Sequence, residues 1–440
     1  MNTNILDFGV IPNSSEICTS KIQAAIDTCA ATGGGRVTVP AGLYISGSIW
    51  LRSHVELHLE HGAVIKGSTN MADYNEEDAF PQNMSSPTSE KWLGKHLVLA
   101  VECEDVAVTG TGTLDGSGDA FFGEPTYFSA YVWNEGGFTR VKDPKVLRPG
   151  PLLCIVECQS VTVKDITITN QPCWGCWLYG CDYVTVNGLK TRNPHYFFNS
   201  DGIDIDCCRY VTVSDCLIDT GDDAIAVRGN ATRLKNSGHT CEYITITNCV
   251  LGSCSSTFRI GVGKNGTIRH IRVSNITVTR GAPLIQIQSS YMGWGDVTIS
   301  DVNFCNISAA NCPRVFMLDE SAGVKIEHIT MENIRVETQG YFDLSSNFPD
   351  TVDNITFRNW DITLREPPEI KIEKDYVRRG THWFRARNIH GLKLEGIRVF
   401  DDGNYLTQWQ GGMFQFDGCR DGKFVDVTVN GQPVSKQLDD

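Results

Sequence analysis

Several features are missing from this 440-residue sequence, beginning with any run of about eighteen apolar residues, the length at which a segment becomes a candidate for a bilayer-spanning helix. Basic residues are also in deficit: 38 Lys and Arg stand against 52 Asp and Glu, which gives a formal net charge of −14. This sign of charge argues against nucleic acid and against an anionic membrane surface as partners. The opening residues carry neither a basic segment nor an apolar core typical of a secretion signal, so we expect a cytoplasmic protein.

Helical patterns are scarce as well. One helix is expected at residues 20–31, where Ile22, Ala25, Ile26 and Cys29 recur on one face, and no long helix is expected after residue 32. Because the open end of a stacked coil of strands exposes unpaired edges, a helix there would protect it. Residues 1–50 are therefore expected to form an N-terminal cap.

Cysteine is abundant, with seventeen residues, but it does not form the short, even-numbered pattern of a secreted disulfide framework. The cysteines are scattered, often beside β-branched residues. Cys173 and Cys176 have redox spacing, although no βαβ pattern surrounds them. We expect buried thiols that fill core positions in a reducing compartment.

A short phrase recurs from about residue 97 onward: an apolar triplet, a polar turn and a second apolar strand. CQSVTVKDITITN, CDYVTVNGLKTRN, CRYVTVSDCLIDTG and CEYITITNCVLGS are examples. Short strands rich in Val, Ile and Thr, separated by Asn, Asp and Gly at such intervals, predict an all-β, single-stranded, right-handed parallel β-helix. Recurrent turn asparagines fit either stacked amides or left-handed turns. A propeller is the main rival, but its blade signatures are missing.

The whole chain, residues 1–440, is expected to form a single β-helix domain, because a solenoid grows by adding rungs and needs no second core. Insertions interrupt the repeats, and in solenoids such insertions tend to gather on the binding face. We expect them to form a cleft from residues at about 74–95, 119–150, 289–296, 340–350 and 366–384.

Two acidic turns carry the candidate chemistry. Asn199-Ser200-Asp201-Gly202 and Thr220-Gly221-Asp222-Asp223 each precede a short apolar strand and are offset by about one rung. Stacked rungs lie about 4.8 Å apart, so Asp201, Asp222 and Asp223 are expected to be neighbours. Carboxylates this close cannot all be ionised comfortably, and a retained proton is the starting condition for acid/base work on a glycoside.

The segments KIQAAIDTCAATGGGRVTVPAGLYISGSIWL, RPGPLLCIVECQSVTVKDITITNQPCWGC and NSDGIDIDCC…TGDDAIAVRG resemble glycoside hydrolase family 28, the polygalacturonase-like enzymes. The resemblance implies a right-handed β-helix and hydrolysis with inversion. Residue by residue, Asp201 matches the acid of an Asn-Thr-Asp motif in which Ser200 replaces Thr. It implies that Asp222 is the general acid and that Asp201 and Asp223 hold and activate water. The one-rung offset is expected to suit the roughly 6.5–9.5 Å acid–base separation of inverting enzymes.

Two departures from the family pattern concern substrate binding. Ser256 stands where the family has the histidine of Gly-His-Gly, and Gln286-Ile287-Gln288 stands where it has Arg-Ile-Lys. An arginine fork and a lysine read a uronate carboxylate by charge, whereas Gln286 and Gln288 bring none. We therefore expect a neutral sugar, or another sugar that is not galacturonate, at the cleaved position. Three cations are candidate replacements: Arg228, Arg259 and Lys264.

Further candidates come from histidines and aromatic residues. His195, just before the first acidic turn, is a candidate substitute for the missing histidine, and so is His239. Flat aromatic faces match the C–H faces of pyranosides. Trp294 is a candidate substrate-binding residue, and some of the other aromatic residues in or near the insertions are expected to stack on sugars: Trp133, Trp174, Trp177, Tyr291, Trp383 and Trp409.

The leading functional hypothesis is a glycosidase that cleaves oligosaccharides, exo-acting and inverting, without a cofactor or a metal. One alternative is a β-helical lyase or epimerase, in which the acidic residues would hold a hard cation. Another is a non-catalytic sugar-binding solenoid, which the loss of the family His, Arg and Lys would suit.

Overall fold

The computed structural model describes residues 2–76, 92–122, 132–133, 147–235, 239–291, 293, 295–338, 340–365, 370–371 and 381–434. The chain divides into two compact units. The first comprises residues 1–126, 140–222 and 233–239, and the second comprises residues 127–139, 223–232 and 240–440.

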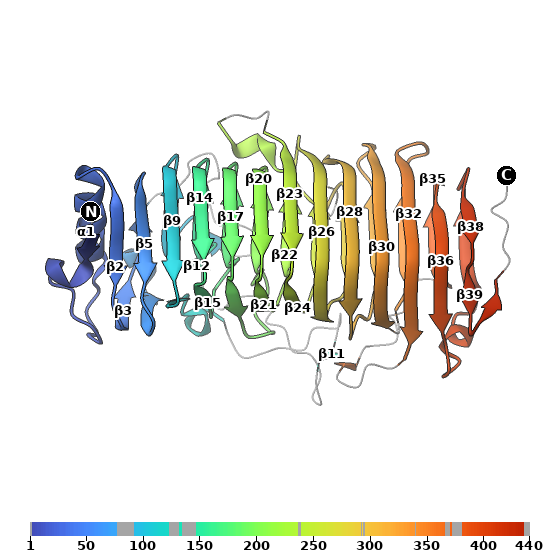
Figure 1. Ribbon diagram of the computed structural model, residues 1–440, viewed down its shortest axis with the longest axis horizontal. Helices are drawn as coiled ribbons and strands as arrows, with labels where there is room; N and C mark the ends of the chain where they lie inside the picture. The colour runs from blue at the N-terminus through green and yellow to red at the C-terminus, as the bar shows by residue number, and fades with distance from the viewer. Residues whose placement is uncertain are drawn as a thin grey trace. The chain divides into compact units, whose positions relative to one another are not determined.

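One α-helix begins the first unit. Helix α1 spans Thr19–Ala31 and buries Ile22, Ala25, Ile26 and Cys29, the four residues of the predicted face. It packs on the first strands of the unit, beside β2 (Gly35–Val39), as Figure 1 shows at the blue end of the chain. The predicted capping helix is therefore confirmed. No helix in the described part of the chain is long and apolar enough to cross a membrane.

The strands of the first unit form two parallel sheets. The first sheet contains β1 (Asn2–Asn4), β2, β3 (Gly42–Ser46), β5 (Val55–Leu59), β6 (Ala63–Gly67), β9 (Glu104–Gly110), β10 (Thr113–Asp115), β14 (Gln159–Lys164), β15 (Thr167–Thr169), β17 (Asp182–Asn187), β18 (Lys190–Arg192), β20 (Arg209–Ser214) and β21 (Leu217–Thr220). The second contains β4 (Ile49–Trp50), β8 (Val98–Val101), β13 (Leu153–Val156), β16 (Cys176–Tyr179) and β19 (Ile203–Asp206). A separate parallel pair joins β7 (Trp92–Leu93) to β12 (Arg148–Pro149).

The register within this unit explains the repeated sequence phrase. Val161 of β14 pairs with Val184 of β17, which pairs with Val211 of β20, and all three are buried. Alternate residues of each strand thus point inward at the same position of every rung. The apolar triplet of the repeat fills one layer of the core per rung.

The second unit continues with the same two kinds of sheet. One contains β23 (Cys241–Thr247), β24 (Val250–Ser253), β26 (Thr267–Arg280), β28 (Thr298–Ala309), β30 (Ile326–Thr338), β32 (Val352–Leu364), β35 (Ile389–His390), β36 (Lys393–Phe400), β38 (Lys423–Val425), β39 (Thr428–Val429) and β40 (Gln432–Pro433). The other contains β22 (Ile225–Arg228), β25 (Phe258–Gly261), β27 (Ile285–Gln288), β29 (Phe316–Glu320), β31 (Phe342–Ser346), β34 (His382–Arg387) and β37 (Gly412–Asp417). β11 (Val132–Trp133) pairs antiparallel with β33 (Ile370–Lys371).

Short 3-10 helices complete the described elements: η1 (Ile5–Phe8), η2 (Met71–Asp73), η4 (Gly118–Ala120), η5 (Ala231–Arg233) and η6 (Tyr405–Gln408). Almost all described strand pairs in the two sheets are parallel, which excludes the antiparallel blades of a propeller. The predicted fold class, an all-β right-handed parallel β-helix, is confirmed.

One predicted insertion is wrong. Residues 340–350 contain β31, which pairs in parallel with β29 and β34 and buries Phe342 and Leu344. This segment is a rung of the core. Most of the ranges 74–95, 119–150 and 366–384 lies outside the described residues.

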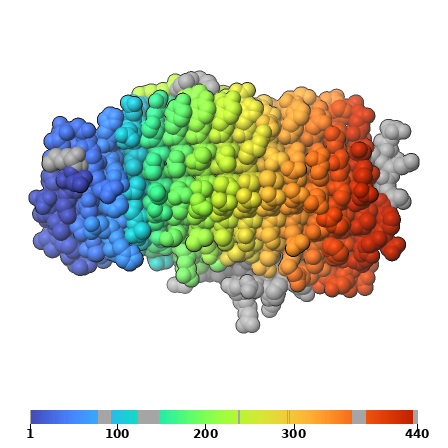
Figure 2. Space-filling view, viewed as in Figure 1, coloured from blue at the N-terminus to red at the C-terminus, as the bar shows by residue number. Residues whose placement is uncertain are grey.

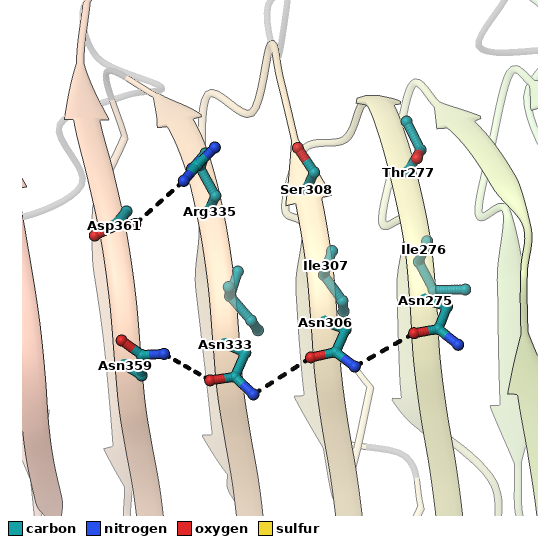
Figure 3. A pocket seen from close by; sticks show the side chains of 11 residues that line it. Asn275, Ile276, Thr277, Asn306, Ile307, Ser308, Asn333, Arg335, Asn359 and Asp361 are labelled. Atoms are coloured by element: carbon teal, nitrogen blue, oxygen red, sulfur yellow. Dashed lines mark hydrogen bonds and ion pairs between the residues drawn. The ribbon is translucent and has the colours of Figure 1, made fainter.

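The turn asparagines of the second unit form a ladder of side-chain amides. Asn306 donates to Asn275 at 3.3 Å, Asn333 donates to Asn306 at 3.3 Å, and Asn359 donates to Asn333 at 2.6 Å, as Figure 3 shows. Each of these asparagines has a φ between 54° and 57°, the left-handed region. Both predicted uses of the turn asparagines therefore occur together. In Figure 2, side chains of this unit line up in rows across its surface.

The ladder lines an open groove, together with side chains that include Thr277, Ser308, Arg335 and Asp361. Because its amides bond to one another, and Arg335 lies 3.6 Å from Asp361, the groove has a structural explanation. None of the candidate catalytic residues lines it.

None of the seventeen cysteines forms a disulfide, and all except the half-buried Cys305 are buried. Cys158 accepts a hydrogen bond from the backbone N–H of Cys103, and Cys208 accepts one from Cys181, one rung apart in each case. Thiols therefore fill repeated core positions, as predicted.

Candidate active site

The first acidic turn and Asp222 belong to the first unit. Asp201 lies two residues before β19, and Asp222 lies two residues after β21. Their side chains are largely buried, and one carboxylate oxygen of each lies within 4.8 Å of the other. The next residue along the chain is Asp223. The offset of the two acidic turns thus brings Asp201 and Asp222 together, as the repeat predicts.

Two backbone contacts hold this pair of turns. The N–H of Asn199 donates to Oδ2 of Asp222 at 2.8 Å, and the N–H of Gly221 donates to Oγ of Ser200 at 3.1 Å. Asn199 has a φ of 53°, a left-handed conformation that asparagine tolerates well. The turn that presents Asp201 therefore also fixes one oxygen of Asp222.

The close approach of Asp201 and Asp222 bears on the expected acid–base geometry. Their nearest oxygens are closer than the roughly 6.5–9.5 Å separation that we expected for an inverting acid–base pair. The nearest-oxygen distance between Asp201 and Asp222 therefore does not meet that expectation.

Asp223 begins the second unit and lies in a cationic setting. Arg259 forms an ion pair with its Oδ2 and donates from Nη2 to Oδ1 at 3.2 Å, and Nη2 of Arg228 lies 3.9 Å from Oδ2. The backbone N–H of Ser256 also donates to Oδ1 at 3.0 Å. Burial acts to raise the pKa of Asp223, but the two arginines and hydrogen bonds from Arg259 and Ser255 outweigh it and lower that pKa. Asp223 is therefore held as a carboxylate.

The side chain of Ser256, which stands where the family has a histidine, is completely buried. Its hydroxyl donates to Oε1 of Gln286 at 2.7 Å. This contact orients the Gln286 amide and leaves Ser256 without access to a substrate. The register places Ala226, Arg259 and Gln286 in one row across β22, β25 and β27.

The three candidate cations differ in the groups that they contact and in their exposure to solvent. Arg259 donates from Nη1 to Oε1 of Gln288 at 3.1 Å and lies over the ring of Tyr291, 5.6 Å from its centroid. Arg228 also faces Asp223, as described. Lys264 is exposed. The charge of Arg259 is thus already used by a carboxylate of the protein.

The histidine and aromatic candidates differ in their contacts and in how exposed they are. His195 pairs through Nε2 with Asp219 at 3.1 Å, and both side chains are more than one third exposed. The position of His239 indicates no role for this residue. Trp174 packs edge-on against Trp177 in the first unit. Trp383 and Trp409 are buried, and Tyr291 is exposed. Trp294 and the side chain of Trp133 lie outside the described residues.

Sequence reasoning missed two contributors to these acidic groups, the backbone N–H of Asn199 and the hydroxyl of Ser255. The asparagine was visible as a turn residue, but a backbone amide has no sequence signature. Ser255 lies in the Ser255-Ser256-Thr257 segment, where only the register decides which hydroxyl turns toward Asp223.

A parallel β-helix with a close pair of buried aspartates, followed in the chain by an ionised one, has the groups needed for acid–base hydrolysis of glycosides. The model of glycosyl hydrolases family 28 matches residues 29–364. The chain belongs to this family, as the sequence resemblance predicts.

Individual relatives are more distant. A probable polygalacturonase from Vitis vinifera is 23% identical over 296 residues, which cover 66% of this chain and 57% of that protein. An exo-poly-alpha-D-galacturonosidase from Dickeya chrysanthemi is 26% identical over 253 residues, 50% of this chain and 41% of that protein. The chain therefore spans about half the length of these two relatives.

Among solved structures, an exopolygalacturonase from Thermotoga maritima is similar, with a TM-score of 0.66 and 22% identity over 82% of this chain and 87% of that chain. A likeness at this level of identity establishes the shared fold.

Proposed function

We propose that this protein is an exo-acting glycosidase that hydrolyses oligosaccharides with inversion. Inversion rests on the family resemblance, because Asp201 and Asp222 approach each other more closely than the usual acid–base separation of inverting enzymes. Asp222 is the general acid, and Asp201 and Asp223 form the base side that holds and activates water. Membership of family 28, with the matching positions of the three aspartates, is the observation that carries the proposal. The family does not favour the lyase or epimerase alternative.

The charge state of Asp223 supports this division of roles. A general acid must carry a proton, whereas Arg259 and Arg228 keep Asp223 ionised. Protonated Asp222 would donate to the glycosidic oxygen as the bond to the anomeric carbon breaks. Water would lose a proton to the base side as it attacks that carbon.

The cleaved sugar in this proposal is neutral, or carries its charge away from Gln286 and Gln288. Amides supply hydrogen bonds without charge, and Arg259, the nearest cation on these strands, already pairs with Asp223. An added uronate would have to compete for that guanidinium. Exo action is supported by the names of relatives such as the exo-poly-alpha-D-galacturonosidase, and it remains part of the proposal.

The test is a panel of galacturonic, galactosidic, rhamnosidic and fructosidic oligosaccharides, with products followed by NMR. We expect release of terminal sugars, with the inverted anomer appearing first. Asp222→Asn should lower kcat by at least about a hundredfold, the scale of general acid catalysis. Full activity of that variant would refute the role of Asp222, and the retained anomer would refute inversion.

We further propose a cytosolic location. The seventeen cysteines support it, because none of them forms a disulfide and oxidising compartments favour disulfides. Fractionation of the source cells tests it, and recovery outside the cytosol would contradict it.

A further inference from the structure

The guanidinium of Arg148, in the first unit, is completely buried. Arg148 lies on β12, which pairs with β7, and its Cζ lies near two aromatic rings, 5.3 Å from the centroid of Phe122 and 5.1 Å from that of Phe198. Removing a permanent charge from water is costly unless its donors are well used. The hydrogen bonds that Arg148 donates therefore indicate what its buried charge stabilises.

Two described contacts take these donors to the turn region. Nη1 donates to the backbone carbonyl of Pro172, and Nη2 donates to Oδ1 of Asn199 at 2.8 Å. Asn199 is also the residue whose N–H holds Oδ2 of Asp222 at 2.8 Å. A continuous path of hydrogen bonds thus runs from a buried arginine, through one asparagine, to Asp222.

The geometry of Asn199 joins the two ends of this path. Asn199 has a left-handed φ of 53°, its amide N–H donates to Asp222, and its side-chain oxygen is the atom that Arg148 binds, so one residue links the guanidinium to the acid. A guanidinium has a rigid fork of donors, so it bonds to Pro172 and Asn199 at once. A lysine has a single ammonium on a flexible stem and does not reproduce that geometry.

We propose that Arg148 is a positioning residue for the general acid: it fixes Asn199, whose amide fixes Oδ2 of Asp222 and so aims Oδ1 at the glycosidic oxygen. This inference rests on the proposed function of Asp222. Arg148 touches neither the substrate nor the reacting atoms in this account. It acts through the orientation of the carboxyl group.

The test compares Arg148→Lys, Asn199→Gly and Asp222→Asn. Asn199→Gly keeps the left-handed turn and the amide N–H but removes the oxygen that Arg148 binds. We expect Arg148→Lys and Asn199→Gly each to lower kcat by about ten- to a hundredfold on the oligosaccharide that the panel identifies, with KM changed less than about threefold. The double variant should lose no more than the worse single variant, because both act on one path.

A second substrate separates positioning from general damage. The 2,4-dinitrophenyl glycoside of the same sugar has a leaving group that needs no proton, so a defect in acid catalysis should nearly disappear with it. Arg148→Lys and Asn199→Gly should then recover to within about threefold of the wild type, whereas distortion of the fold would reduce both reactions. Arg192→Lys, an exposed arginine of β18, is the matched control and should behave as the wild type.

The outcomes separate the two proposals. If Asp222→Asn loses activity while Arg148→Lys and Asn199→Gly keep full kcat, or if the two losses multiply, the positioning role is refuted and the proposed function stands. If Asp222→Asn keeps full activity, the proposed role of Asp222 fails. A crystal structure of Arg148→Lys gives a readout without activity: we expect the bond from Asn199 to Asp222 to be lost, and its persistence would overturn the inference. If Arg148→Lys does not fold, Asn199→Gly carries the same test.

Discussion

Arg259 and Asp223 form an ion pair whose side chains are only 13% and 3% exposed. Ser256, whose backbone N–H donates to Asp223, stands where the family pattern has a histidine, and Gln286 and Gln288 stand where it has an arginine and a lysine. A guanidinium committed to a protein carboxylate sets the charge of that carboxylate and is withdrawn from recognition of a uronate.

The first prediction concerns this pair. Arg259→Gln removes the main cation that lowers the pKa of Asp223, so that pKa should rise. Activity that needs ionised Asp223 is lost as the pH falls through its pKa, and the acidic limb of the profile of kcat/KM against pH should therefore move to higher pH by about one unit or more. Arg272→Gln, which removes an exposed arginine paired with Asp301, is the control. An unmoved acidic limb would contradict the role of Arg259.

A pH dependence of stability is expected from His96. Burial lowers the pKa of His96 from 6.5 to about 4, although its hydrogen bond to the carbonyl of Pro151 acts to raise it. Between pH 6.5 and pH 4 the unfolded chain binds a proton at this residue more readily than the folded chain does. The free energy of unfolding should therefore decrease as the pH is lowered, and this group should account for a decrease of about 2 kcal/mol between pH 7.5 and pH 5.

Denaturant unfolding at the two pH values measures this effect. His96→Gln should show a smaller acid-induced loss than the wild type, and exposed His61→Gln should not differ from the wild type. Equal losses in all three proteins would exclude His96 as the source.

Glu320 is predicted to be a strong stabilising residue of the second unit. Its buried carboxylate accepts hydrogen bonds from the backbone N–H groups of Ala322, Gly323 and Val324 and from the hydroxyls of Ser346 and Thr351. Glu320→Gln replaces one accepting oxygen of the carboxylate with an NH₂ group, which cannot accept the hydrogen bonds that the surrounding N–H and hydroxyl groups donate. We expect a loss of about 2–4 kcal/mol in the free energy of unfolding. Exposed Asp402→Asn should change it by less than about 0.5 kcal/mol.

The asparagine ladder supplies a prediction about the turns. Asn306→Ala removes both amide bonds and places alanine at a φ of 55°, so we expect a loss of about 1–2 kcal/mol. Asn306→Gly removes the same amide bonds but tolerates the turn, and it should lose less. Thermal unfolding of both variants separates ladder bonds from backbone conformation; a glycine variant less stable than the alanine variant would argue against strain at this turn.

The sequence was most informative where a residue's identity and its period agreed. Ile22, Ala25, Ile26 and Cys29 follow a helical period, and all four are buried on α1. The stacked valines of the recurrent phrase predict parallel rungs in the same way. Asp201 and Asp222 could be paired because their turns repeat at the interval of a rung.

Other features depend on contacts between rungs, which a single rung does not reveal. Residues 340–350 were assigned to an insertion because they interrupt the recurrent phrase, yet β31 within this range pairs with β29 and β34 as a rung of the core. Ser256 was expected at the substrate, but register turns its hydroxyl toward Gln286. The partner of Arg259 could not be predicted, because Asp223 lies 36 residues earlier.

The buried cysteine side chains can report where this protein unfolds. A thiol shielded by neighbouring rungs reacts with an alkylating reagent only when the surrounding coil opens. Cysteines occur in both units, so peptide mapping of the labelled sites after a short pulse would show, rung by rung, which part of the coil opens first.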